Sequence, residues 1–373
     1  MRLGMLSWII DRQRTGVDTY LYNLLTSMIE LGKSNDIFLI HYKKTNDRVY
    51  TLANDIIVPN VPRILKYSIG IPYAIKKANL DVLHAPIHWY TQITPFFLNY
   101  NVKKVLTIHD LTPILFPKTH TKQTVQLWNP TLKLIKNKID IIIADSNNTK
   151  NDCIKYLGIP EERIKVICLA PNEIFTPQKN KEKLRSYLQN KFDLNFPFIL
   201  SVGTLEKRKN IPNLLKAFYK LKKTDKNHKL VIVGGKGWRY EGIFDYLCKL
   251  NLEKDVIFTG YISDEDLFKF YNTADLFVYP SLYEGFGLPP LEAMACGCPV
   301  ITSNTSSLPE VIGDAGIMID PTDSDALFDA IHRILNDDDL KAELSKKSLQ
   351  RAKMFSWKKT ARETWKVYEK VLE

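Results

Sequence analysis

Residues 276–301 read LFVYPSLYEGFGLPPLEAMACGCPVI, and this stretch indicates the fold class more clearly than any other part of the sequence. Its first four residues are apolar, which is typical of a strand buried on both faces in a parallel sheet. A loop with two glycines follows, and Pro289 and Pro290 are typical of the first turn of a helix. Gly297 predicts the end of that helix, and the apolar run at 299–301 predicts the next strand. The stretch is therefore one strand–helix–strand unit of an α/β domain.

The same alternation of strands and helices continues in both directions along the chain. Buried strands are predicted at residues 3–10, 37–42, 82–84, 104–108, 139–144, 198–203, 229–233 and 256–259. The clearest helices are predicted at 17–31, which ends before Gly32, at 211–222, with Asn210 as its N-cap, and at 357–372. Strand–helix alternation in both halves predicts two doubly wound, Rossmann-like α/β domains.

The length of 373 residues also favours two domains, because a single core seldom grows beyond about 250–300 residues. The segment 170–177 contains two prolines and shows no periodicity, so it predicts a linker. The predicted domains are therefore residues 1–172 and 173–356. The helix near residues 357–373 is expected to pack back onto the first domain.

The positive charge of the chain is concentrated in its first half. Residues 1–172 hold 22 of the 52 Lys and Arg residues but only 13 of the 41 Asp and Glu residues. Such a balance indicates an anionic partner, which could be a phospholipid surface, a lipid-phosphate acceptor or a nucleic acid, or else only a well-solvated surface. No recognisable nucleic-acid-binding motif is present, so nucleic acid is not expected as a partner.

No stretch approaches the roughly 20 apolar residues that span a bilayer, and the apolar N-terminal run is followed at once by charged residues, unlike a signal peptide. We therefore expect a cytoplasmic protein, with peripheral contact at the inner membrane face. The residues expected to make this contact are the apolar stretch 67–75 and the cations that flank it, Arg63, Lys66, Lys76 and Lys77.

The loop and helix at 284–292 are the strongest candidate site. Gly285 and Gly287 let the backbone approach a ligand, and the free amides at a helix N-terminus favour a phosphate. Glu284 in the loop and Glu292, expected in the first helical turn, could accept hydrogen bonds from hydroxyls of a sugar or ribose. Taken singly, each acid could equally be a solvated residue or one that stabilises its own helix.

A second candidate site lies at residues 203–210, which read GTLEKRKN between a predicted strand and a predicted helix. Arg208 and Lys209 would oppose the dipole of that helix unless an anion lay beside them, and a diphosphate would supply that anion. By contrast, Ser307 and Glu310 are interpreted as a helix capping box and not as a catalytic pair.

Three further positions of the first half follow predicted strands. Gly16 occupies a strand–helix turn, and His109, followed by Asp110, lies at the carboxyl end of the strand at 104–108. His84 and His88 are weaker candidates for the acceptor side.

The spacing of Glu284 and Glu292 resembles the E-x7-E motif of glycosyltransferase family 4, the retaining transferases of GT-B fold. The resemblance implies that the two Rossmann-like domains face each other across a cleft. The flanking residues 279–281 and 293–301 fit the same pattern, and the stretch at 203–210 is most similar to that of mannosyltransferases. The resemblance covers nearly the whole chain. One departure is Thr204, because many relatives carry arginine directly after the glycine.

The resemblance implies a role for each candidate residue. Glu284 would contact hydroxyls of the donor sugar, and Glu292 would hold the ribose. The backbone of Phe286, Gly287 and Leu288 would meet the sugar and the diphosphate. The donor phosphates would also contact Gly16 and the two cations Arg208 and Lys209, and the sugar pocket would contain His109.

The expected function is therefore transfer of a hexose, with mannose as the first guess, from a nucleotide-diphosphate sugar to a glycan or lipid-linked acceptor. Retention of configuration and independence of metal ions are expected. No cofactor is expected beyond the nucleotide-sugar co-substrate, GDP-mannose or a UDP-sugar. The alternatives are a nucleotide-sugar epimerase of the same fold and a non-catalytic nucleotide-sugar-binding subunit.

Overall fold

The structure is a computed structural model that describes residues 1–8, 10, 16–43, 48–62, 65–87, 94–97, 101–237 and 240–373, so Arg63 and His88 lie outside the described residues. Its internal contacts divide the chain into two compact units, Met1–Leu169 with Ser356–Glu373, and Ala170–Phe355. The break falls at the start of the predicted linker, and the C-terminal helix belongs to the first unit. Within the described ranges, no helix is long and apolar enough to cross a bilayer.

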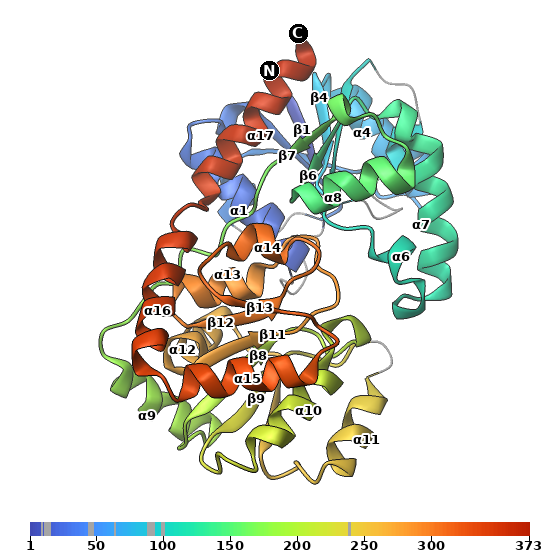
Figure 1. The fold of residues 1–373 in the computed structure, drawn as a ribbon. Helices are drawn as coiled ribbons and strands as arrows, with labels where there is room; N and C mark the ends of the chain where they lie inside the picture. The colour runs from blue at the N-terminus through green and yellow to red at the C-terminus, as the bar shows by residue number, and fades with distance from the viewer. Residues whose placement is uncertain are drawn as a thin grey trace. The chain divides into compact units, whose positions relative to one another are not determined.

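The first unit is built on a seven-stranded sheet in which all neighbouring strands run parallel (Figure 1). Its order is β3-β2-β1-β4-β5-β6-β7, so the direction of winding reverses between β1 and β4. Open α/β sheets bind ligands at such a reversal, beyond the carboxyl ends of the strands. The strands are β1 (Leu3–Leu6), β2 (Ile37–His41), β3 (Asn54–Ile57), β4 (Val82–Ala85), β5 (Lys103–Ile108), β6 (Ile141–Ala144) and β7 (Ile164–Val166).

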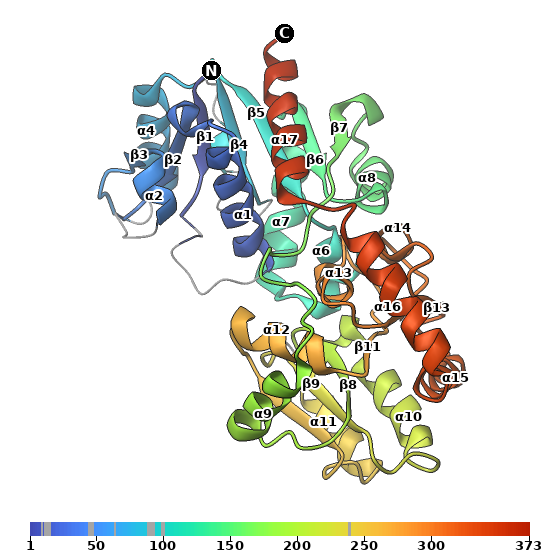
Figure 2. The same ribbon diagram turned by 90° about the vertical axis from the view of Figure 1, so that its left-hand side faces the viewer.

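Helices connect these strands, and α1 packs beside the C-terminal helix α17 against the sheet (Figures 1 and 2). The helix α17 buries one face, because its apolar and small residues recur at helical spacing from Trp357 to Tyr368. The helices of this unit are α1 (Gly16–Glu30), α2 (Arg48–Leu52), a π-helical turn (Lys66–Gly70), α4 (Ile71–Ala78), α6 (Thr112–Leu115), α7 (Lys122–Ile135), α8 (Asn147–Asp152) and α17 (Trp357–Leu372).

A buried chain of hydrogen bonds fastens α17 to the sheet. The Tyr368 hydroxyl lies 2.7 Å from Nδ1 of His84 on β4, and Nε2 of His84 lies 2.9 Å from the hydroxyl of Thr107 on β5. Burial lowers the pKa of His84 to about 3, so the ring is neutral. His84 therefore belongs to the core, and its expected place on the acceptor side is wrong because both ring nitrogens have partners inside the unit.

Replacing Tyr368 by phenylalanine is expected to lower the melting temperature by several degrees. The change leaves Nδ1 of His84 buried without a partner, which costs about 1–3 kcal/mol, and 1 kcal/mol corresponds to roughly 2–4 °C in a domain of this size. Differential scanning calorimetry measures the shift. Tyr156→Phe, at an exposed tyrosine of the same unit, is the control. Equal melting temperatures for the two variants would contradict this role of Tyr368.

The second unit has a six-stranded parallel sheet of order β10-β9-β8-β11-β12-β13. Here the winding reverses between β8 and β11, which places the residues that follow these two strands at the expected ligand-binding edge. The prediction of two doubly wound α/β domains is confirmed. The strands are β8 (Phe198–Val202), β9 (Lys229–Val233), β10 (Val256–Gly260), β11 (Leu276–Tyr279), β12 (Val300–Ser303) and β13 (Ile317–Ile319).

Helices cover both faces of this sheet: α10, α11 and α15 pack together on one face, and α9 and α12 pack on the other (Figure 2). The side of α10 and α15 contributes much of the core, with Leu214, Phe218 and Leu327 fully buried. The helices are α9 (Lys181–Phe192), α10 (Ile211–Leu221), α11 (Glu241–Lys249), α12 (Asp264–Thr273), α13 (Leu288–Ala295), α14 (Leu308–Ile312), α15 (Ser324–Leu335) and α16 (Asp338–Ala352).

Candidate active site

The loop between β11 and α13 makes a sharp entry into the helix at Gly287. Its φ is 114°, and a Cβ at this position would lie 2.8 Å from Cδ2 of Leu308, so only glycine fits without strain. The helix α13 begins at the next residue, Leu288, and the following two residues are prolines. Among the described residues, the amides of Phe286, Gly287 and Leu288 donate no hydrogen bond. The loop therefore offers three neighbouring donors to an anion.

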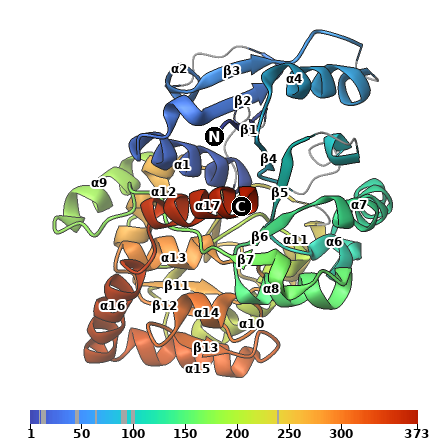
Figure 3. The same ribbon diagram turned by 90° about the horizontal axis from the view of Figure 1, so that it is seen from above.

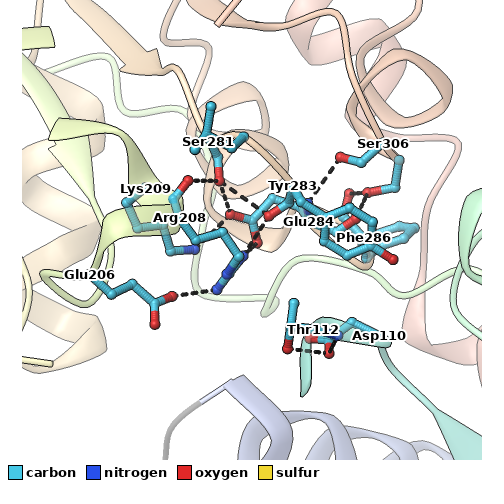
Figure 4. Close-up of polar contacts among 12 residues, drawn as sticks. Asp110, Thr112, Glu206, Arg208, Lys209, Ser281, Tyr283, Glu284, Phe286 and Ser306 are labelled. Carbon is cyan, nitrogen blue, oxygen red and sulfur yellow. Dashed lines mark hydrogen bonds and ion pairs between the residues drawn. The ribbon is translucent and has the colours of Figure 1, made fainter. Parts of the chain in front are cut away.

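Glu284 is the centre of a buried polar cluster in this loop (Figure 4). Its side chain is only 10% exposed. Its Oε1 accepts hydrogen bonds from Lys209 Nζ at 2.8 Å and Ser281 Oγ at 2.5 Å, and its Oε2 lies 2.7 Å from Arg208 Nη1. The structure thus brings together the two candidate sites that the sequence places about 80 residues apart.

The two cations come from a 3-10 turn (Lys207–Lys209) that follows β8, and not from the first turn of α10. Arg208 also donates to the carbonyl of Tyr283 at 2.7 Å and pairs with Glu206 at 2.6 Å. Lys209 Nζ donates to the hydroxyl of Tyr279 at 2.5 Å. Two cations therefore face two carboxylates, so their charge is already balanced by protein groups. The anion that the sequence led us to expect beside these cations is therefore present as the carboxylates of Glu206 and Glu284, and binding of a diphosphate there stays a prediction.

The pKa of Glu284 and the pKa of Lys209 are both lowered in this cluster, but for different reasons. Burial alone would raise the pKa of Glu284, but Arg208 and Lys209 overcome it and lower the pKa to about 2. Burial and the charge of Arg208 lower the pKa of Lys209, while Glu284 opposes this. A depressed carboxyl pKa stabilises the fold above the unfolded value, and this stabilisation is lost as the pH falls from about 4.5 toward 2. The carboxylate of Glu284 is therefore ionised near neutral pH.

Serines of the β12–α14 connection hold the loop in place. Ser306 Oγ accepts from the amide of Glu284 at 2.9 Å. Ser307 Oγ lies 2.9 Å and 2.6 Å from the carbonyl oxygens of Glu284 and Phe286. Ser307 does precede α14, but its side chain forms no cap hydrogen bond. The predicted capping box is therefore wrong, because the hydroxyl binds the glycine loop instead.

The N-cap predicted at Asn210 is found at that position without the expected capping bond. Asn210 has a φ of 57° and precedes α10, but its amide donates to the carbonyl oxygens of Pro280 and Pro321 at 3.1 Å and 2.5 Å. It thereby ties the segment after β8 to the segment after β11. Like the serines, it was missed as a site residue because only the folded chain shows these partners.

Glu292 is the fifth residue of α13, so it lies beyond the first turn in which the sequence placed it. An acid there gains little from the helix dipole. Its Oε2 accepts from the hydroxyl of Tyr271 at 3.0 Å. Burial raises the pKa of Glu292 to about 8, although the Tyr271 bond works against this. Glu292 is thus mostly protonated at neutral pH, and it can both donate and accept a hydrogen bond.

The variant Glu292→Gln is expected to remove one component of the pH dependence of stability. Between pH 4.5 and 8 the folded state keeps a proton that the unfolded state releases, so the free energy of unfolding of the native chain falls as the pH rises. Glutamine resembles the protonated acid and should flatten this slope, which urea denaturation across the window measures. Glu241→Gln, at an exposed position, is the control. If the free energy of unfolding depends on pH with the same slope in the native chain and in the Glu292 variant, the raised pKa of Glu292 is refuted.

In the first unit, both ring nitrogens of His109 have partners. Nδ1 lies 2.6 Å from Asp145 Oδ2, and Nε2 lies 3.0 Å from the carbonyl oxygen of Pro86. A carbonyl only accepts, so Nε2 carries a proton. Burial would lower the pKa of His109, but the ion pair with Asp145 raises it above its ordinary value. The contact with Asp145 therefore favours the protonated form of the His109 ring. Its role in a sugar pocket stays a prediction.

Two other positions of this unit are less informative. Asp110, the neighbour of His109, accepts from the amide and hydroxyl of Thr112 at 2.9 Å and 2.6 Å, which shapes the turn after β5. Gly16 is the first residue of α1, and a Cβ there would meet no atom of the described residues within 4 Å. The described surroundings of position 16 therefore leave room for a side chain, and the contact of Gly16 with donor phosphates stays a prediction.

Two models of known protein families together match most of the chain. The profile of Glycosyl transferases group 1 matches residues 174–351, and that of Glycosyltransferase Family 4 matches residues 14–170. The O-antigen chain mannosyltransferase B of Escherichia coli is 35% identical over 277 residues, which are 74% of this chain and 72% of that protein.

Comparison with solved structures shows the same fold. Sucrose-phosphate synthase from Thermosynechococcus elongatus superposes with a TM-score of 0.80 at 23% identity, covering 99% of this chain and 98% of that one. Anabaena HepE, solved in complex with UDP-glucose, superposes with a TM-score of 0.77 at 17% identity, covering 99% and 100%. At such identities the likeness concerns the fold alone.

Proposed function

Because this chain belongs to glycosyltransferase family 4 and has the GT-B fold, it is a glycosyltransferase, and we propose that it transfers mannose from GDP-mannose with retention of configuration. The acceptor is a glycan or a lipid-linked glycan. The proposal on the donor sugar follows the relative at 35% identity, which is an O-antigen chain mannosyltransferase. A UDP-sugar is the second choice, in keeping with the UDP-glucose of the HepE complex.

The observation that carries this proposal is the cluster of Glu284, Arg208 and Lys209 beside three free amides. In the proposal, the amides of residues 286–288 and the two cations hold the diphosphate, where an N-terminal helix dipole also favours negative charge. Glu284 is ionised and faces the same loop, so it can accept hydrogen bonds from the donor sugar. Glu292, protonated beside Tyr271, holds the ribose.

The proposed step moves one glycosyl unit without a covalent enzyme intermediate. The bond between the sugar C1 and the phosphate oxygen breaks first, and the C1–O bond to the acceptor hydroxyl forms on the same face. The acceptor proton passes to the departing phosphate oxygen. Arg208 and Lys209 stabilise the negative charge that develops on the diphosphate. Cations held in fixed positions commonly stabilise the transition state of transfer reactions in this way. We propose that these two charges make a metal ion unnecessary.

Thermal shifts across a panel of nucleoside diphosphates test the donor. Ligand at 100 times its Kd stabilises a protein by about 2.7 kcal/mol, so GDP should raise the melting temperature most and UDP less. If no nucleoside diphosphate of the panel raises the melting temperature, the proposed donor site is refuted. Incubation with GDP-mannose and candidate acceptors, with and without EDTA, should then give an α-linked product at equal rates. A product of inverted configuration, or free epimerised sugar, would contradict the proposed reaction.

A further inference from the structure

Asp145 directly follows β6, and its side chain is only 2% exposed. Its Oδ2 lies 2.6 Å from Nδ1 of His109, whereas among the described residues its Oδ1 has no hydrogen-bond partner. A buried carboxyl group normally has partners for both oxygens, because a buried polar atom without a partner lowers the stability of the fold. Stability alone therefore does not explain a carboxylate at this position.

Asp145 and His109 belong to a chain of contacts across the ends of three neighbouring strands. The strands β4, β5 and β6 lie side by side in the sheet (Figure 3), and Pro86, His109 and Asp145 are the first residues after them. The ring of His109 joins the other two residues, since its Nε2 lies 3.0 Å from the carbonyl oxygen of Pro86. The chain of contacts therefore lies at the carboxyl edge of the sheet, where open α/β sheets bind ligands.

The surrounding elements leave the His109 ring little freedom. The ring of Tyr20 on α1 packs edge-on against it, with 4.8 Å between the ring centroids, and the Tyr20 hydroxyl lies 3.0 Å from that of Thr107. The hydroxyl of Thr149 donates to the carbonyl oxygen of His109 at 3.2 Å. The His109 side chain is 12% exposed, whereas that of Asp145 is buried. A ligand can thus reach the histidine but not the carboxylate, so Asp145 can act only through His109.

The titratable groups around His109 favour its protonated form mainly through one residue. Burial would lower the pKa of His109, but Asp145, with a smaller contribution from Asp110, raises it. Burial keeps two other titratable neighbours uncharged, because it raises the pKa of Tyr20 and lowers that of His84 to about 3. Asp145 is therefore the main group that favours a proton on both ring nitrogens of His109.

We propose that Asp145 is a positioning residue of the transfer reaction, which fixes the orientation and the proton of the His109 ring. A histidine without such a partner exchanges its tautomers and can turn its ring. A carboxylate at Nδ1 selects one arrangement and leaves the Nε2–H directed toward the segment after β4. This inference rests on the proposed function and on the predicted place of His109 in the sugar pocket. It assigns a role to a residue that lies outside every motif singled out in the sequence.

The variant Asp145→Asn tests this role, because it keeps the size of the side chain and removes its charge. The pKa of His109, followed by NMR of the labelled ring nitrogens, should fall, since the carboxylate then no longer opposes the effect of burial. At about pH 8 the variant should transfer sugar about 10–100-fold more slowly, with an unchanged KM for the donor. The difference from the native chain should shrink as the pH falls toward about 5, because the ring then regains its proton.

A second histidine–aspartate pair of the chain serves as the control. His228 Nδ1 lies 2.5 Å from Asp225 Oδ2 just before β9, at the amino edge of the other sheet. Burial would lower the pKa of His228, but its aspartate neighbours raise it. Asp225→Asn should therefore lower that pKa and keep native transfer at every pH. In addition, the double variant of Asp145→Asn with His109→Gln should be no slower than His109→Gln alone, because the carboxylate acts only through the ring.

The proposal is overturned if Asp145→Asn keeps native turnover, or if its loss is equal at every pH, as a purely structural defect would make it. It is also overturned if His109 of the native chain titrates at or below its ordinary pKa of 6.5, a measurement that needs no variant. GDP should raise the melting temperature of Asp145→Asn as much as that of the native chain, which shows that the variant is folded. A native chain that neither binds a nucleoside diphosphate nor transfers sugar would instead contradict the proposed function itself.

Discussion

The variant Glu284→Gln is expected to transfer sugar about 10²–10³-fold more slowly while it binds the nucleoside diphosphate as well as the native chain, or better. The loss is of the size found when one fixed group that stabilises a transition state is removed. Glutamine keeps the shape of the side chain but not its charge. In the native cluster, Glu284 competes with any diphosphate for Arg208 and Lys209. Neutralising it frees both cations for the phosphates.

The measurement separates turnover from affinity. Steady-state transfer gives the first, and calorimetric titration with GDP gives the second. Breaking a buried ion pair costs about 3–5 kcal/mol, so the transfer assay is run below the melting temperature of the variant. A separate melting experiment with saturating GDP checks that the variant is folded. Glu265→Gln, at an exposed glutamate of the same unit, should match the native chain. Full activity of the Glu284 variant would show that the carboxylate has no part in transfer.

The buried parts of the fold could be predicted from the sequence. The central strands are apolar on both faces, and strands such as Lys229–Val233 and Leu276–Tyr279 have the predicted bounds. The edge strands β3, β7 and β13 were missed. The strand β3 is mostly exposed and includes Asn54 and Asp55, and β7 and β13 have three residues each. Such segments carry no pattern of burial, because only their pairing with a neighbour makes them strands.

The candidate site could be predicted only where local sequence carries the chemistry. The spacing of Glu284, Gly287 and Glu292 lies within one loop and one helix, so it can be read directly. The supporting residues Ser281 and Ser307 could not be found in this way. The local sequence does not distinguish a serine that caps a helix from one that donates to a distant carbonyl. Which of the two occurs depends on how β11 and β12 pair.

The carboxylates that balance the charges of Arg208 and Lys209 could likewise not be predicted from the sequence. The stretch 203–210 shows three consecutive cations, from Lys207 to Lys209, which suggests an open positive turn. In the folded chain only Lys207 of the three is exposed. The other two point toward carboxylates, one of which lies 75 residues away. A contact of that kind follows from the strand order β8-β11 and not from composition.

The variant Lys209→Met is expected to lose affinity for the nucleoside diphosphate as well as turnover, which is the opposite effect on binding from that of Glu284→Gln. Lys209 Nζ is fixed between Glu284 and Tyr279, so its charge needs no reorganisation when the diphosphate leaves. Removing such a charge should lower the transfer rate by about 10²–10³-fold. Methionine keeps the apolar stem that packs near Gly203, so the change tests the charge alone.

Lys207→Met is the matched control, because Lys207 lies on the same 3-10 turn but is exposed. It should keep native turnover and native GDP affinity. Together the variants distinguish two explanations of the cluster. If it only stabilises the fold, Lys209→Met and Glu284→Gln should both lower the melting temperature without changing GDP affinity in opposite directions. If it binds the diphosphate, loss of the cation must weaken GDP binding, and loss of the competing carboxylate must not.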